Sequence, residues 1–196
     1  MDGFRIELDF LHEAIAERIA YWKKNKDRLR ASRAIVEKAL EDGKSYYGIN
    51  TGFGVLAKKR IPSDQLKQLQ KNIVLSHAIG VGDLIPKDIT RLMLQLKIHS
   101  LALGFSGISE GTFDRLVYFA EHDLIPAVPR KGSVGASGDL APLAHMCLPL
   151  LGEGEFHDQS GKGVEPAAAV LGRHKLKPVE LQAKDGLALI NGTQMM

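Results

Sequence analysis

The sequence has little of what marks several common classes of protein. It contains one cysteine, Cys147, and one tryptophan among 196 residues, which excludes a disulfide-stabilised scaffold. A single thiol in a charged chain is typical of a reducing compartment, so we expect a cytoplasmic protein. The longest apolar stretch, 140–151, is interrupted by two prolines and a histidine and is too short to span a bilayer. The first residues lack the apolar core of a signal peptide, and we expect no membrane association.

Neither sign of charge dominates the chain. It has 26 lysines and arginines against 23 aspartates and glutamates, for a net charge of +3. The basic runs Lys23–Lys26 and Lys58–Arg60 have no aromatic residues between their charges, so we expect solvated surface there and no binding of nucleic acid. Hydrophobic residues make up 44% and charged residues 25%, which is ordinary for a folded protein and excludes disorder as the main state.

The spacing of apolar residues predicts helices through the first half of the chain. The stretch 11–25 has a stripe at Leu11, Ile15, Ile19 and Trp22, and the stretch 28–42 has one at Ala31, Ile35, Ala39 and Leu40. Ser63 is placed to cap a third helix. Pro86 suits the start of a fourth, which runs to Gly104, and a fifth is expected over 112–122.

The second half of the chain has a different composition, with more prolines and glycines between its apolar stretches. Prolines keep the stretch 124–129 extended, since a residue that precedes proline avoids the helical region. Asp139 is placed to cap one helix, and Asp185 to cap another that begins near Leu187 and runs toward the end of the chain. The stretch 153–177 has the polar, glycine-rich composition of loops and turns. We predict a mainly α-helical fold with no internal domain boundary.

Three glycine-rich segments stand out from this helical background: Tyr46–Gly54, Gly132–Pro142 and Leu189–Gln194. Glycines at such positions let the backbone approach a ligand or another backbone closely. Taken alone, the middle segment is open to three interpretations: a phosphate-binding loop, a hydrolase nucleophile at Ser137, or a plain structural loop. It lacks the Lys-Ser/Thr pair of a P-loop, and Ser137 does not stand in a G-x-S-x-G pattern.

Together the three segments resemble the histidine/phenylalanine ammonia-lyase family. The resemblance covers essentially all of residues 1–196, as the N-terminal part of a longer family chain that is truncated here before the long central helices. In that family an Ala-Ser-Gly triad cyclises and dehydrates to 4-methylidene-imidazol-5-one, the electrophile of the reaction. The triad corresponds to Ala136, Ser137 and Gly138. The resemblance therefore implies a cofactor made from the chain itself, and no external cofactor.

The residue types suit this chemistry. The backbone nitrogen of Gly138 must attack the carbonyl of Ala136, and a residue without a Cβ hinders that attack least. Ser137 must supply a β-hydroxyl that can leave, which generates the methylidene group. For Asp139 two roles stay open: an N-cap of the following helix, or a direct part in cyclisation.

The resemblance also implies roles for residues in the other two segments. Tyr47 corresponds to the base that takes the β-proton of the substrate. A free phenol has a pKa of about 10, so a tyrosine base needs a site that stabilises its phenolate. Asn191 corresponds to an amide beside the electrophile and substrate, where it can both donate and accept, and Gln194 would support it. The plainer alternatives are a packing aromatic for Tyr47 and a turn amide for Asn191.

His77 bears on the choice of substrate. The resemblance implies that it contacts the imidazole of a histidine substrate, although tyrosine-specific relatives also place a histidine there. A structural histidine near a helix end is the plainer alternative. The strings 75–82 and 131–135 favour the histidine-specific branch. We therefore expect elimination of ammonia from L-histidine to give urocanate, with a phenylalanine or tyrosine ammonia-lyase, or an aminomutase, as alternatives.

The resemblance has consequences for assembly. Family members are homo-oligomers, tetramers among them, whose sites combine several subunits and act on a small amino acid. We therefore expect little lyase activity from the 196-residue chain alone, and a non-catalytic fragment is the alternative of another class. Stripes such as Leu92–Leu96–Leu103 and Leu140–Leu143–Leu150 would lack cover and favour association. The histidines other than His77 show no metal-ligand spacing, so we expect no metal.

Overall fold

The structure is a computed structural model that describes residues 2–52, 59–132 and 135–196, with side chains from Asp9 onward. Within these ranges the helices are α1 (Asp2–Lys24), α2 (Asp27–Glu41), α3 (Leu66–His77), α4 (Lys87–Ala102), α5 (Glu110–Glu121), α6 (Leu140–Cys147), α7 (Ala167–Arg173) and α8 (Asp185–Ile190). The 3-10 helix η2 (Ser63–Gln65) precedes α3, and η3 (Leu148–Leu151) follows α6. The strands are β1 (Val81–Leu84), β2 (Pro129–Lys131), β3 (Glu155–His157) and β4 (Val164–Pro166). The expected mainly α-helical fold is confirmed.

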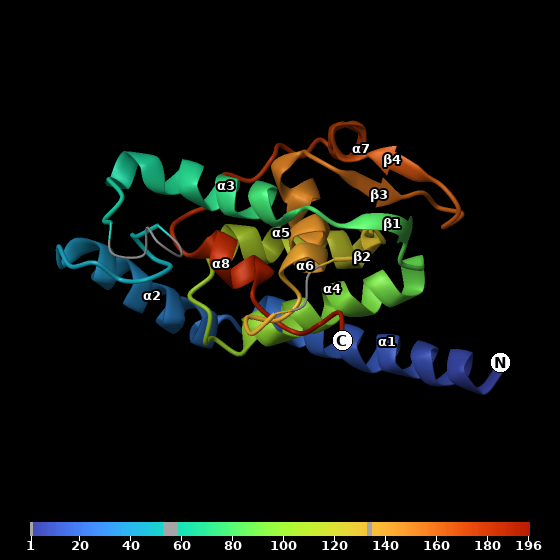
Figure 1. Ribbon diagram of the computed structural model, residues 1–196. Helices are drawn as coiled ribbons and strands as arrows, with labels where there is room; N and C mark the ends of the chain where they lie inside the picture. The colour runs from blue at the N-terminus through green and yellow to red at the C-terminus, as the bar shows by residue number, and fades with distance from the viewer. Residues whose placement is uncertain (1, 53–58, 133–134) are drawn as a thin grey trace.

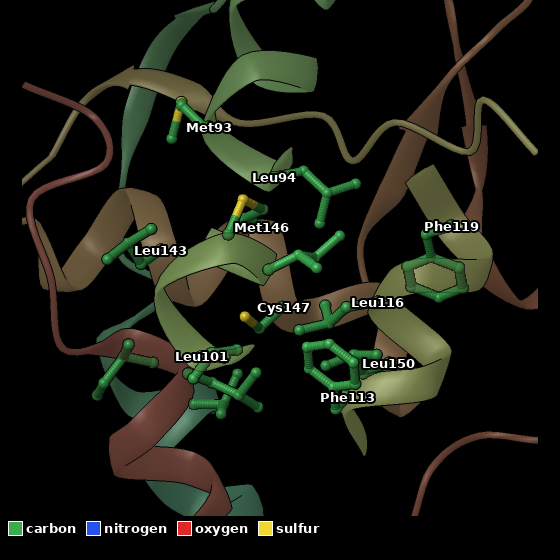
Figure 2. Packing of buried hydrophobic residues seen from close by; sticks show 14 of the residues in the cluster. Met93, Leu94, Leu101, Phe113, Leu116, Phe119, Leu143, Met146, Cys147 and Leu150 are labelled. Atoms are coloured by element: carbon green, nitrogen blue, oxygen red, sulfur yellow. The ribbon is translucent and has the colours of Figure 1, made fainter. Parts of the chain in front are cut away.

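One apolar core holds the longer helices together. Helix α4 packs against α1 and α5, while α6 packs against α3 and α8 (Figure 1). Figure 2 shows the centre of this core, which includes Met93, Leu94, Leu101, Phe113, Leu116, Phe119, Leu143, Met146, Cys147 and Leu150. Burying one such side chain contributes roughly 1.5–3 kcal/mol, so this packing holds α6 against its neighbours. None of the helices within the described ranges has the length and apolar character needed to cross a membrane.

Short strands connect segments that are far apart in the sequence. Strands β1 and β2 pair antiparallel, with Val81 opposite Lys131 and Leu84 opposite Pro129. The extended stretch 124–129 was expected, but its pairing with β1 was not. Strands β3 and β4 form an antiparallel hairpin, and α7 follows it within a stretch expected to be loop and turn. The β1–β2 pair carries the end of α3 alongside the strand that leads into the central glycine-rich segment.

The expected apolar stripe of α2 is wrong. Its buried residues are Leu29 and Val36, while Ile35 is 71% exposed. The buried face of a helix is set by its packing partner, here α4, and not by the largest count of apolar positions. The apolar stripe of α6 and η3 was expected to lack cover. This is also wrong, because Leu143 and Leu150 are fully buried within this chain.

Three expectations about helix ends also need correction. Ser63 is the first residue of η2 and does not cap α3. Asp139 precedes α6, but its side chain makes no capping hydrogen bond to that helix. Helix α8 ends at Ile190 and does not run toward the last residue, because Asn191 adopts an extended conformation. The carbonyls of Asn191 and Gly192 then bond to groups outside α8.

A buried carboxylate joins the start of α8 to the start of α5. Asp185 is fully buried, and it accepts hydrogen bonds from the backbone N–H of Ser109 (2.8 Å), the Ser109 hydroxyl (2.7 Å) and the Thr112 hydroxyl (2.9 Å). It also accepts from the backbone N–H of Gln182 at 2.9 Å. The expected cap of α8 is therefore a brace between two helices, which sets the position of the segment after α8.

We expect Asp185→Ala to lower the free energy of unfolding of this chain by about 3 kcal/mol, because it leaves several buried donors without an acceptor. Urea denaturation followed by circular dichroism measures the loss. The matched control is Asp64→Ala, which removes an exposed aspartate of η2 and should change the stability by less than about 0.5 kcal/mol. Equal stability of the two variants would contradict the brace.

Candidate active site

Ala136, Ser137 and Gly138 lie in a tight turn between β2 and α6. The backbone N–H of Gly138 donates to the carbonyl of Gly135 at 2.9 Å, and the N–H of Gly135 donates to the carbonyl of Gly138 at 3.3 Å. Ala136 and Ser137 are exposed, whereas Gly138 is buried. The turn therefore presents the serine at the surface of this chain and is anchored by its glycine.

Gly138 is buried against Gly192, which follows α8. Its φ of +93° is a conformation that residues with a side chain rarely adopt, and a Cβ there would overlap the Gly192 carbonyl oxygen. The backbone N–H of Asp139 donates to that oxygen at 2.7 Å, and Gly138 and Gly192 form a parallel bridge. The structure thus brings together two of the three glycine-rich segments, and it places Asn191 next to the triad.

The Asp139 carboxylate turns toward the end of the chain and away from α6. It is fully buried, and its Oδ2 accepts from the backbone N–H groups of Met195 (3.0 Å) and Met196 (3.1 Å). Its Oδ1 is also buried but has no hydrogen-bond partner among the described residues. Of the two roles left open for this residue, the N-cap is excluded.

The side-chain oxygen of Gln194 is a second buried acceptor without a hydrogen-bond partner among the described residues. Its amide lies over Gly192, where an added Cβ would overlap the Gln194 Oε1 atom. That oxygen is buried and has no hydrogen-bond partner in the described part of the chain. Buried acceptors are normally satisfied, so Asp139 Oδ1 and Gln194 Oε1 favour a ligand that supplies donors. Within the described ranges, no three His, Cys, Asp or Glu side chains are grouped as metal ligands.

His77 is the last residue of α3 and is half-buried. Its Nδ1 lies 2.8 Å from the carbonyl oxygen of Ile73. The chain that follows is tied to α6, because the backbone N–H of Gly80 donates to Nε2 of His145 at 2.9 Å. Burial lowers the pKa of His145, which favours the neutral imidazole that can accept this bond. His77 thus begins the segment that runs beside the strand leading into the triad turn.

Tyr47 is not brought to the triad within this chain. The segment 44–52 lies at the α2 end of the molecule, away from the turn that precedes α6 (Figure 1). The Asn50 amide folds this segment, since its oxygen accepts from the backbone N–H of Tyr46 (2.7 Å) and its nitrogen donates to the carbonyl of Lys44 (2.8 Å). Tyr47 is 60% exposed. The last two residues of this glycine-rich segment, Phe53 and Gly54, lie outside the described residues.

Sequence reasoning missed Lys97, a buried lysine in the middle of α4. Only 1% of its surface is exposed, and its Nζ donates to the backbone carbonyl of Asn191 at 2.8 Å. Burial lowers its pKa to about 8. The nearby Cys147 is buried as expected, and burial raises the pKa of its thiol to about 12, which makes it unreactive. The available signal was the spacing of four residues from Met93 and from Leu101, which places Lys97 on an apolar helix face.

The chain is similar in sequence to known proteins over most of its length. A family model described as aromatic amino acid lyase matches residues 8–196. The histidine ammonia-lyase of Anaeromyxobacter sp. (strain K) is 50% identical across all of this chain, which covers 40% of that protein. The histidine ammonia-lyase of Legionella pneumophila (strain Corby) is 53% identical over 85% of this chain and 33% of its own length. The chain therefore spans 33–40% of the length of these relatives.

Solved structures share the fold. The crystal structure of histidine ammonia-lyase from Trypanosoma cruzi superposes with a TM-score of 0.78 at 39% identity, over 86% of this chain and 32% of that one. The tyrosine aminomutase from Streptomyces globisporus superposes with a TM-score of 0.82 at 33% identity, over 94% of this chain and 35% of that one. The same helical arrangement therefore occurs in a lyase and in an aminomutase.

Substitutions of two glycines in the same turn test the contact between Gly138 and Gly192. We expect Gly138→Ala to destabilise this chain by about 2 kcal/mol or more, because the residue has a positive φ and its Cβ would overlap a backbone oxygen. Gly135→Ala is the matched control, since a Cβ there meets no atom of the described residues within 4 Å. Urea denaturation of both variants tests this. A Gly138→Ala chain as stable as the Gly135→Ala chain would show that the contact does not constrain the turn.

Proposed function

Because this chain belongs to the aromatic amino acid lyase family, we propose that the full-length protein eliminates ammonia from L-histidine and releases urocanate. The observation that carries this proposal is the packing of the Ala136–Gly138 turn against Gly192, the residue that follows Asn191. Identities of 50–53% to histidine ammonia-lyases support histidine as the substrate. The protein then acts in the first step of histidine degradation.

The electrophile we propose is 4-methylidene-imidazol-5-one, formed from Ala136, Ser137 and Gly138. The nitrogen of Gly138 bonds to the carbonyl carbon of Ala136, whose oxygen leaves as water with the backbone protons of Gly138 and Ser137. The second water takes the Ser137 hydroxyl and its Cα proton. The structure is compatible with this route, because only glycine fits at 138. The hydrogen bond from the backbone N–H of Gly138 to the carbonyl of Gly135 must break first.

Asp139 is the group best placed to assist this ring closure. Its Oδ1 is buried next to the triad and has no hydrogen-bond partner among the described residues. A carboxylate oxygen in that position can accept a backbone proton as it leaves. Its other oxygen, Oδ2, accepts hydrogen bonds from the backbone N–H groups of Met195 and Met196. These bonds keep the carboxylate in place while the turn rearranges.

The elimination breaks the bond between Cα and the amine nitrogen and moves a proton from Cβ to a base. When formed, the electrophile supplies a reactive carbon beside the substrate, which makes ammonia a feasible leaving group. We assign Tyr47 as the base that takes the β-proton, after which a double bond joins Cα and Cβ. Because its segment lies away from the turn of this chain, Tyr47 would act at the turn of another subunit in a homo-oligomer, such as the family tetramer.

The remaining residues bind and orient the substrate. We assign His77 to the substrate imidazole, as the family resemblance implies, and this is compatible with its place at the start of the segment that pairs with the strand before the turn. We assign the Asn191 amide to the electrophile and the substrate, because an amide can both donate and accept and the next residue, Gly192, contacts Gly138. We assign Asp139 Oδ1 and Gln194 Oε1, which have no hydrogen-bond partner among the described residues, as acceptors for the substrate amine and for the ammonia that leaves.

An aminomutase is the alternative that a specific observation supports, since a tyrosine aminomutase superposes with a TM-score of 0.82. Its identity to this chain is 33%, against 50–53% for the histidine ammonia-lyases. The lyase reaction on histidine is therefore favoured. The 196-residue chain spans 33–40% of these lyases, so we assign the activity to the full-length protein and expect little turnover from this chain alone.

We expect Ser137→Ala in the full-length protein to lower the rate of urocanate formation about a thousandfold or more, because alanine has no hydroxyl to lose. The ultraviolet absorbance of urocanate follows the rate. Ser160→Ala is the control, since it makes the same change in the hairpin turn after β3, where the hydroxyl bonds to Asp158. Wild-type turnover by the Ser137→Ala protein would refute the electrophile.

Substrate choice is tested separately at His77. We expect His77→Phe in the full-length protein to lower kcat/KM for histidine about a hundredfold, because a site built to bind a polar ring loses its partner. The ratio of phenylalanine to histidine turnover should rise. His122→Phe, at an exposed position at the end of α5, should leave both values unchanged. Unaltered histidine kinetics in the His77→Phe protein would exclude the contact.

A further inference from the structure

Lys97 places an ammonium group inside the apolar core. Met93 and Leu101, four residues before and after it on α4, are both buried. Within the described part of the chain, its hydrogen bond is to the carbonyl oxygen of Asn191, at 2.8 Å. A buried charge that faces a neutral acceptor, with no carboxylate bonded to it, is costly for a fold. Its position therefore calls for a role other than stability.

The contact of Lys97 continues directly to the triad. Asn191 is followed by Gly192, whose carbonyl accepts from the N–H of Asp139 and lies against Gly138. The Asp139 carboxylate in turn accepts from the last two backbone N–H groups of the chain. The segment 191–196 is thus held by a buried cation at its start and by a buried carboxylate at its end, and the triad glycine lies beneath its second residue.

We propose that Lys97 is a positioning residue of the elimination reaction. Its ammonium group holds the Asn191 carbonyl and thereby fixes the backbone of Asn191 and the Gly192 carbonyl that packs against Gly138. Hydrogen bonds from an ammonium group are about twice as strong as neutral ones, which suits the short link between α4 and this segment. The inference rests on the function proposed above for that turn, and it concerns a residue that does not touch the substrate.

The charge of Lys97 separates this role from a purely structural one. The groups that face it are the Cys147 thiol from α6 and the Lys184 ammonium just before α8, and burial lowers its pKa from 10.5 to about 8. Because the folded-state pKa lies below the unfolded one, the unfolded chain binds more protons between these two values. The stability cost of the charge is therefore full below pH 8 and disappears as the pH rises toward 10.5.

The test uses the full-length protein and compares Lys97→Met with the wild type. Methionine keeps the length and the apolar stem but removes the charge and the donor. We expect kcat for histidine to fall at least about tenfold, with KM changed less than about threefold. The melting temperature at pH 7 should be equal to or higher than that of the wild type, and the difference should shrink as the pH rises toward 10. A loss of activity without a loss of stability is a result that a structural role does not give.

Gln95→Met is the matched control, because it removes another buried polar side chain of α4 that bonds to His12 and not to Asn191. It should keep the wild-type kcat. Lys97→Gln is the second variant: it keeps a donor without the charge, and we expect its kcat also to fall. If both Lys97 variants fail to fold, or lose activity only in proportion to lost stability, Lys97 is structural and the inference is wrong.

Two further outcomes distinguish this inference from the proposed function. A wild-type protein that makes urocanate alongside an equally active Lys97→Met protein overturns the positioning role alone. A wild-type protein that makes no urocanate overturns the proposed function, and the positioning role with it.

Discussion

The structure depends on one contact, the packing of Gly138 and the backbone N–H of Asp139 against the carbonyl of Gly192. It joins the turn before α6 to the segment after α8, two parts of the chain that are separated by α6, η3, the β3–β4 hairpin, α7 and α8. A glycine is required on the α6 side because the backbone has a positive φ and the opposing oxygen leaves no room for a Cβ. The triad and Asn191 become neighbours through this contact.

Buried charges and the core hold both sides of that contact. Asp185 fixes the start of α8 to α5, Lys97 holds the first residue beyond α8, and the Asp139 carboxylate holds the end of the chain. On the other side, the apolar core fixes α6 and the β1–β2 pair fixes the strand before the turn. Each buried charge costs free energy unless it is well paired.

The sequence predicted the helices better than their arrangement, and the roles of the site residues stay predictions. Apolar spacing predicted α1, α4 and α5 because these helices are long and have a clear buried face. It failed for β1, for the hairpin and for the buried face of α2, because pairing and packing partners decide these. Lys97 and the Asp185 brace depend on contacts between residues more than 70 positions apart, which local pattern does not contain. Tyr47 was singled out by resemblance alone, and this chain does not place it beside the triad.

We propose that Ala136, Ser137 and Gly138 become the electrophile without any added cofactor. The intact mass of the purified full-length protein tests it most directly, because ring closure and loss of the serine hydroxyl each release one water. We expect a mass lower by two waters in the wild type and the unmodified mass in a Ser137→Ala protein. A protein that converts histidine to urocanate while its mass matches the unmodified sequence would exclude this electrophile.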